Sequence, residues 1–176
     1  AVFPGTQGGP LEHIIAAKAV AFGEALQPEF KTYAENILKN AKVLAKRLME
    51  LGFVLQGNGT ENHLILINMK ESFGLDGKFY EKALDLVGLT LNANAVPSDK
   101  AAAFRPSGVR LGVPAITTRG MGEKEMIRIA DWMKKVADLC VKAGSEDKIE
   151  DIRPELDEIH QEVTKMALEF PVPGIS

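Results

Sequence analysis

Cysteine is almost absent from this sequence, since Cys140 is the only one among 176 residues. One thiol excludes an intramolecular disulfide framework and a cysteine-rich zinc site, and it favours a reducing compartment such as the cytoplasm. Histidine is also scarce: His13, His63 and His160 stand apart and show no spacing typical of metal ligands. We therefore expect no metal site.

An excess of basic residues is lacking too, because 21 Lys and Arg stand against 24 Asp and Glu, a net charge of −3. Surfaces that bind nucleic acid or anionic lipid need positive charge, so we expect neither partner. No apolar run approaches the roughly 20 residues that a membrane span requires, and the first residues do not resemble a signal peptide. These absences favour a cytoplasmic protein with no membrane partner.

The chain starts at Ala1 without an initiator Met and runs directly into a loop rich in glycine and proline, residues 3–10. We expect it to be the C-terminal portion of something longer. Gly8 and Gly9 precede Pro10, and bare backbone N–H groups at such a position can bind an anion. The same residues also suit an ordinary connecting turn, and the loop alone does not decide between the two.

Hydrophobic periodicity predicts helices separated by a small group of strands. The helix over Leu11–Ala25 is apolar around most of its circumference, which predicts that it is buried. Cys140 lies on the apolar stripe of another predicted helix, as a small core residue does. The predicted elements are helices at 11–25, 29–51, 78–87, after Gly120 and from Asp151, where Asp151 is the expected cap, and strands at 53–55, 63–69, 89–94 and around 107–115, with a loop at 95–106. This order predicts an α+β fold with a small, mostly antiparallel sheet layered with helices.

Arg110 stands out within the last of these strands. Val109, Leu111 and Val113 alternate with it, so the guanidinium is expected on the face opposite three aliphatic side chains. Arginine offers a planar fork of donors that matches a carboxylate. The pattern leaves two alternatives open, a solvent-exposed side chain and a carboxylate-binding one.

Six blocks along the chain, in order and at matching spacing, closely resemble serine hydroxymethyltransferase, a fold-type I pyridoxal phosphate enzyme family. The blocks are Ala1–Pro10, Pro28–Tyr33, Asn62–Ile65, Asn92–Pro97, Ser107–Gly112 and Pro114–Gly120. The resemblance covers essentially the whole chain and begins after the middle of that enzyme. It implies that residues 1–28 end the large domain, with the cofactor-phosphate loop and a linking helix, and that residues 29–176 form the C-terminal small domain.

The resemblance also implies roles for individual residues. Arg110 matches the arginine that binds the α-carboxylate of the substrate amino acid. Gly8 and Gly9 match the glycine pair whose N–H groups reach the pyridoxal 5'-phosphate of the partner subunit in a homodimer. Asn94 matches an asparagine that contacts the pteridine of tetrahydrofolate, and the loop from Ala95 to Phe104 lines that entrance. Arg119 matches an arginine near the site, with no contact assigned.

The family's Schiff-base lysine motif does not occur in this sequence, so no catalytic residue is assigned to the chain. The implied activity is that of the full-length transferase, which interconverts serine and glycine and passes a one-carbon unit to tetrahydrofolate. We expect this chain alone to be inactive. An alternative from a different class is a non-catalytic ligand-binding or interaction domain with the same fold.

Overall fold

The computed structural model describes residues 1–102 and 104–174. It divides into two compact units, residues 1–35 and residues 36–176, and the boundary lies within the long helix α2. Each unit is described by itself. The helices are α1 (Glu12–Ala25), α2 (Pro28–Glu50), α3 (Met69–Phe73), α4 (Gly77–Leu86), α5 (Pro114–Thr118), α6 (Glu123–Ala143) and α7 (Arg153–Glu169), with 3-10 turns η1 (Gln56–Asn58) and η2 (Glu146–Ile152), and the strands are β1 (Leu64–Asn68), β2 (Asn92–Asn94) and β3 (Gly108–Gly112).

The first unit holds α1, and none of its residues is buried. The helix forms where the sequence predicts it, but the prediction that it is buried is wrong for this chain: Ile15, Val20 and Phe22 are 58%, 63% and 68% exposed. An apolar helix becomes buried only when a second apolar surface covers it. Residues 1–35 supply no such layer.

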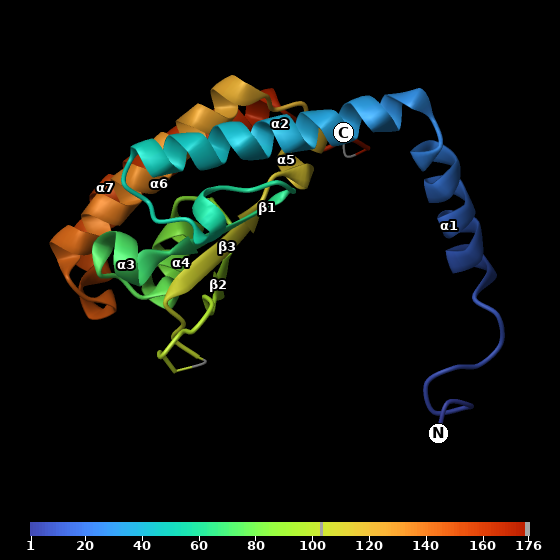
Figure 1. Ribbon diagram of the computed structural model, residues 1–176, viewed down its shortest axis with the longest axis horizontal. Coiled ribbons are helices and arrows are strands. Elements are labelled where there is room, and N and C mark those ends of the chain that lie inside the picture. Colours follow the sequence, from blue (N-terminus) through green and yellow to red (C-terminus); the bar gives the residue numbers. More distant parts are fainter. Residues whose placement is uncertain (103, 175–176) are drawn as a thin grey trace. The chain divides into compact units, whose positions relative to one another are not determined.

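The second unit contains a three-stranded antiparallel sheet in the order β1-β3-β2. β3 is central, and its Arg110 is paired with Leu66 of β1 and with Asn92 of β2. Helix α4 packs against β2 and β3, and α6 and α7 pack against α4. In Figure 1, α6 and α7 run alongside each other above the sheet. The α+β prediction, with a small antiparallel sheet layered with helices, is confirmed.

Local sequence explains where several elements begin and end. The Asp76 side chain caps α4 by accepting a hydrogen bond from the N–H of Phe79 at 2.9 Å. Glu125 accepts one from the N–H of Gly122 at the start of α6, and Gly144 ends α6 in the left-handed conformation with φ of 78°. The cap predicted at Asp151 is wrong, because η2 extends through Ile152 and α7 begins at Arg153 without a side-chain cap.

Two further differences concern short elements. Residues 53–55 were predicted as a strand, but only Leu55 forms an isolated antiparallel bridge, to Ile67. The N–H of neighbouring Val54 bonds instead to the hydroxyl of Ser72 at 2.8 Å. The predicted strand 89–94 shortens to β2. No regular element occurs among the described residues of the predicted loop 95–106, and Ala103 lies outside the described residues.

The core lies between the sheet and the helices, and α6 provides much of it, including Trp132, which is 1% exposed. The Tyr80 hydroxyl, fully buried on α4, donates a hydrogen bond to the carbonyl of Met133 at 2.7 Å. Cys140 is fully buried, and burial raises the pKa of its thiol to about 12. This confirms Cys140 as a small core residue.

Candidate functional site

The sheet has an inner face that is buried and an outer face that carries two of the predicted site residues, Arg110 and Asn94. Ile65, Ile67 and Val109 are fully buried on the inner face. Arg110 and Asn92 are exposed, and they share the outer face because directly paired residues of an antiparallel sheet point the same way. The alternation in the sequence therefore predicts the orientation of Arg110 correctly.

Arg110 differs from the other arginines of the chain in having no partner among residues 1–102 and 104–174. Among the described residues, none forms a hydrogen bond, an ion pair or a ring contact with its guanidinium. The other five arginines have partners: Arg47 with Asp131 and Glu50, Arg105 with Asp76 and Glu146, Arg119 with two backbone carbonyls, Arg128 with the Trp132 ring, and Arg153 with Asp157. The five donors of the Arg110 fork are thus available to a ligand.

Asn94 lies at the end of β2, paired with Gly108, on the same face as Arg110 and diagonal to it. Its Nδ2 atom donates a hydrogen bond to the carbonyl of Ala95 at 2.7 Å. That bond orients the amide group, and none of the described residues donates to its side-chain oxygen. The structure therefore brings Arg110 and Asn94 together, as neighbouring polar groups on one sheet face.

Gly8 and Gly9 belong to the first unit. Thr6 and Gln7 donate their backbone N–H groups to the carbonyl of Val2, at 2.9 and 2.8 Å, whereas no described residue accepts one from Gly8 or Gly9. A Cβ atom built on either glycine meets nothing within 4 Å. These two amides are therefore open to an external acceptor, which is the donor chemistry that a phosphate group fits.

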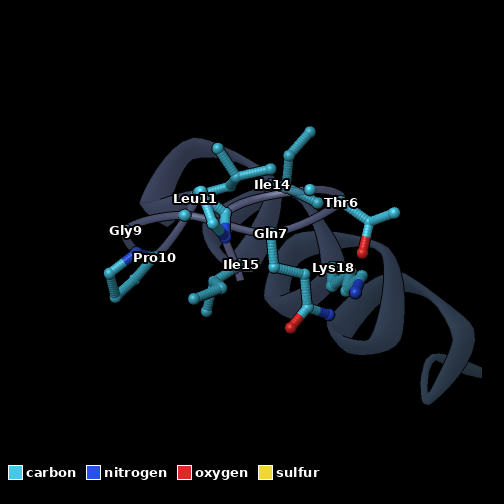
Figure 2. A pocket seen from close by; sticks show the side chains of 11 residues that line it. Thr6, Gln7, Gly9, Pro10, Leu11, Ile14, Ile15 and Lys18 are labelled. Atoms are coloured by element: carbon cyan, nitrogen blue, oxygen red, sulfur yellow. The ribbon is translucent and has the colours of Figure 1, made fainter. Parts of the chain in front are cut away.

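A concavity of about 720 Å³ lies beside this loop. It is lined by residues 4–11 together with Ile14, Ile15 and Lys18 of α1. Figure 2 shows the Lys18 side chain on the same side of the loop as that of Gln7. One cation and unpaired backbone amides make the concavity suitable for an anion.

Arg119, unlike Arg110, is hydrogen-bonded within the fold. Its Nε and Nη2 atoms donate to the backbone carbonyls of Phe170 and Ala167, both at 2.6 Å. These carbonyls end α7, so the guanidinium caps the negative end of the helix dipole. The geometry gives Arg119 a structural role, because two of its donors are already bonded to backbone carbonyls.

Asp99 is a polar residue of this region that no sequence pattern identified. Its carboxylate accepts hydrogen bonds from Ser107, which directly precedes β3, and from Ala101 within the loop. The bonds from the Ser107 N–H and hydroxyl and from the Ala101 N–H lower the pKa of Asp99 to about 2. An aspartate placed after Pro-Ser in a loop is common turn chemistry, so its spacing alone carried no functional signal.

Across residues 1–102 and 104–174, no group of His, Cys, Asp or Glu side chains could hold a metal ion. The helices of the same part of the chain are all too short or too polar to cross a membrane.

A comparison with known families adds one finding to this geometry. The family model described as serine hydroxymethyltransferase matches residues 1–133. The match includes Gly8 and Gly9, the β2–β3 pair with Asn94 and Arg110, and α6 through Met133. The chain belongs to the serine hydroxymethyltransferase family.

Proposed function

We propose that this chain acts as the C-terminal portion of serine hydroxymethyltransferase and supplies contacts to the amino-acid and folate substrates. The reaction interconverts serine and glycine and transfers a one-carbon unit to tetrahydrofolate in the cytoplasm. One observation carries the proposal: Arg110 is the arginine without a partner among the described residues, and it lies on an open sheet face beside Asn92 and Asn94.

In this proposal Arg110 binds the α-carboxylate of serine or glycine. A planar guanidinium forms two parallel hydrogen bonds to a carboxylate, which fixes the rotation of the amino acid as well as its position. β3 holds the arginine firmly, because it is hydrogen-bonded on both sides, to β1 and to β2. A fixed strand loses little conformational freedom when the substrate binds.

Asn94 contributes to the folate side of the proposed site. With its Nδ2 atom committed to the carbonyl of Ala95, its side-chain oxygen is oriented to accept a hydrogen bond. The N–H groups of a pteridine ring are suitable donors. The diagonal placement of Asn94 and Arg110 brings the two proposed substrate contacts onto one face.

The cofactor proposed for the family is pyridoxal 5'-phosphate. The unpaired amides of Gly8 and Gly9, with Lys18 in the same concavity, fit its phosphate group. When bound, the cofactor supplies the electron sink on which bond cleavage at the α-carbon of the substrate depends. We propose that Gly8 and Gly9 serve the cofactor of a partner subunit, so that the working enzyme is at least a homodimer.

Arg110→Lys in the full-length holoenzyme tests the proposal. One ammonium group cannot reproduce a bidentate fork, so we expect the KM for serine to rise about 100-fold, which corresponds to about 3 kcal/mol. The absorbance of the bound cofactor is expected to stay unchanged. Arg153→Lys is the matched control, because Arg153 forms one exposed ion pair, with Asp157 on α7.

An unchanged KM for serine in the Arg110→Lys enzyme would contradict the proposed role. Turnover by the 176-residue chain alone, supplied with the cofactor, would contradict the proposal that it is only part of the catalytic unit. If a longer protein containing this chain binds serine but never converts it, the alternative of a non-catalytic ligand-binding domain is favoured.

A further inference from the structure

The connection between β2 and β3 is unusually long for two adjacent antiparallel strands. Such strands can be joined by a turn of two residues, whereas here residues 95–107 lie between them. Ala103 is not among the described residues of this connection. A connection of this length with no regular structure carries a large conformational entropy unless specific contacts fix it. The proposed folate contact Asn94 and the proposed carboxylate contact Arg110 lie on the strands that flank it.

The Asp99 side chain provides four of these contacts through one carboxylate. Its Oδ1 atom accepts from the Ser107 hydroxyl at 2.7 Å and from the N–H of Ala101 at 2.9 Å. Its Oδ2 atom accepts from the N–H of Ser107 at 2.8 Å and, at 3.4 Å, from the N–H of Val96. One side chain thus joins the start, the middle and the end of the connection.

This set of donors requires a carboxylate. All four groups donate, and an ionised carboxylate has two oxygens that accept in several directions. An asparagine would present an NH₂ group to at least one of the donors, which replaces attraction by repulsion. The low pKa of Asp99 agrees with a carboxylate that stays ionised at neutral pH.

The Asp99 contacts restrain the backbone next to Asn94 more than they restrain the backbone at Arg110. Val96 follows Asn94 by two residues, and its Cγ1 atom lies 2.6 Å from the position that a Cβ atom of Gly108 would occupy. Gly108 is the residue paired with Asn94. Arg110 lies two residues farther along β3, where the ladders to both neighbouring strands hold it independently of the loop.

The Ser107 end is fixed from a second direction. The carbonyl oxygen of Ser107 accepts from the N–H groups of Met69 and Lys70, at 2.9 and 3.1 Å. The end of the connection is therefore anchored to α3 even without Asp99, and Arg105 is held separately by Asp76 and Glu146. The part that the Asp99 carboxylate ties to Ser107 is the one near Val96 and Ala101. Loss of the carboxylate should loosen that part and leave β3 in place.

We propose that Asp99 is a positioning residue for the folate substrate, whose carboxylate holds the β2–β3 connection closed beside Asn94 through Val96, Ala101 and Ser107. This inference rests on the proposed function, since it deepens the role of the same sheet face. It predicts two separate dependences: the affinity for the folate substrate depends on Asp99, and the affinity for serine depends on Arg110.

Asp99→Asn in the full-length holoenzyme tests the inference. We expect the KM for tetrahydrofolate to rise about tenfold, the KM for serine to stay within about twofold of wild type, and kcat at saturation to change little. Asp151→Asn is the matched control, because Asp151 is exposed and none of the described residues forms a hydrogen bond or an ion pair with it. The control is expected to keep both KM values.

A second variant keeps the test decisive if Asp99→Asn does not fold. Ser107→Ala removes one of the four donors, so we expect a rise of about threefold in the KM for tetrahydrofolate. Where Asp99→Asn does not fold, an unchanged KM for tetrahydrofolate in Ser107→Ala would overturn the inference. Where Asp99→Asn folds, Ser107→Ala in that background should add almost nothing, because both residues act through one contact. Additive effects of the two changes would overturn the inference.

Two kinetic outcomes for Asp99→Asn would overturn the inference about Asp99 and leave the proposed function unaffected. The first is an unchanged KM for tetrahydrofolate in a folded Asp99→Asn enzyme. The second is an equal rise in both KM values, which would mean that Asp99 supports the whole sheet rather than the folate side. The proposed function fails separately, when Arg110→Lys leaves the KM for serine unchanged.

Discussion

Arg110 and Arg119 lie in consecutive elements, β3 and the end of α5, yet the two regions treat the same side chain in opposite ways. Around Arg119, backbone carbonyls of α7 accept two hydrogen bonds from the guanidinium. Around Arg110, the described residues provide no acceptor and the sheet face is open. An arginine is therefore assigned to folding or to binding by the acceptors near it, since its own chemistry is the same in both places.

The largest expected effect is a loss of stability from a substitution at Gly108, which lies on β3 two residues before Arg110. Gly108→Ala would place a Cβ atom 2.6 Å from the carbonyl oxygen of Ile67 and equally close to a methyl of Val96. Backbone atoms cannot move aside easily, so we expect unfolding in urea to become easier by about 3 kcal/mol. This result would show that β3 has no room for a side chain at Gly108, whereas its outer face at Arg110 has room for a ligand. A variant as stable as wild type would show that the start of β3 has more room than this.

The next effect concerns Arg119 directly. Arg119→Gln removes two charge-assisted hydrogen bonds at the end of α7, and we expect a loss of about 2 kcal/mol in the free energy of unfolding of the chain. The KM for serine of the full-length enzyme should stay unchanged. A large rise in that KM with little loss of stability would reverse the assignment of the two arginines.

The smallest expected effect is a difference in pH dependence. It separates the contribution of Asp99 to the stability of the fold from that of Arg119. The pKa of Asp99 is about 2 in the folded chain, below its ordinary value of 3.8. A lowered folded pKa stabilises the fold above the ordinary value, and this contribution is lost as the pH falls from about 4 toward 2. The carbonyls that Arg119 contacts do not titrate, so its contribution should be constant over that range.

Urea unfolding at a series of pH values between about 2 and 5 measures this difference. We expect the Asp99→Asn chain to lose less stability on acidification than wild type, and the Asp151→Asn chain to lose more than Asp99→Asn does. Identical pH dependence in wild type and Asp99→Asn would contradict the low pKa of the Asp99 carboxyl.

The sequence predicted the long elements of the fold because periodicity is averaged over several turns. α2, α6 and α7 each have a repeated apolar face, and they occur close to their predicted bounds. α3 and α5, with five residues each, are shorter than any periodic signal. The strand predicted at 53–55 is wrong because the N–H of Val54 bonds to the Ser72 hydroxyl instead of to β1. The bond from the N–H of Asn68 to the carbonyl of Val54 accompanies the isolated bridge between Leu55 and Ile67.

Periodicity and composition could not predict what covers a surface. α1 is apolar around its circumference, yet Phe22 is 68% exposed, because burial depends on a partner surface that the helix sequence does not encode. Alternation around Arg110 predicted its direction correctly, whereas its lack of a partner could be seen only in the structure. The role of Asp99 depends on four donors at separate positions, which no local pattern contains.

The most direct test of the central claim is a crystal structure of the full-length holoenzyme with glycine bound. The account predicts that both carboxylate oxygens of glycine lie within hydrogen-bond distance of the Arg110 guanidinium, while Arg119 keeps its bonds to Ala167 and Phe170. A glycine carboxylate bound elsewhere, with Arg110 still without a partner, would contradict it.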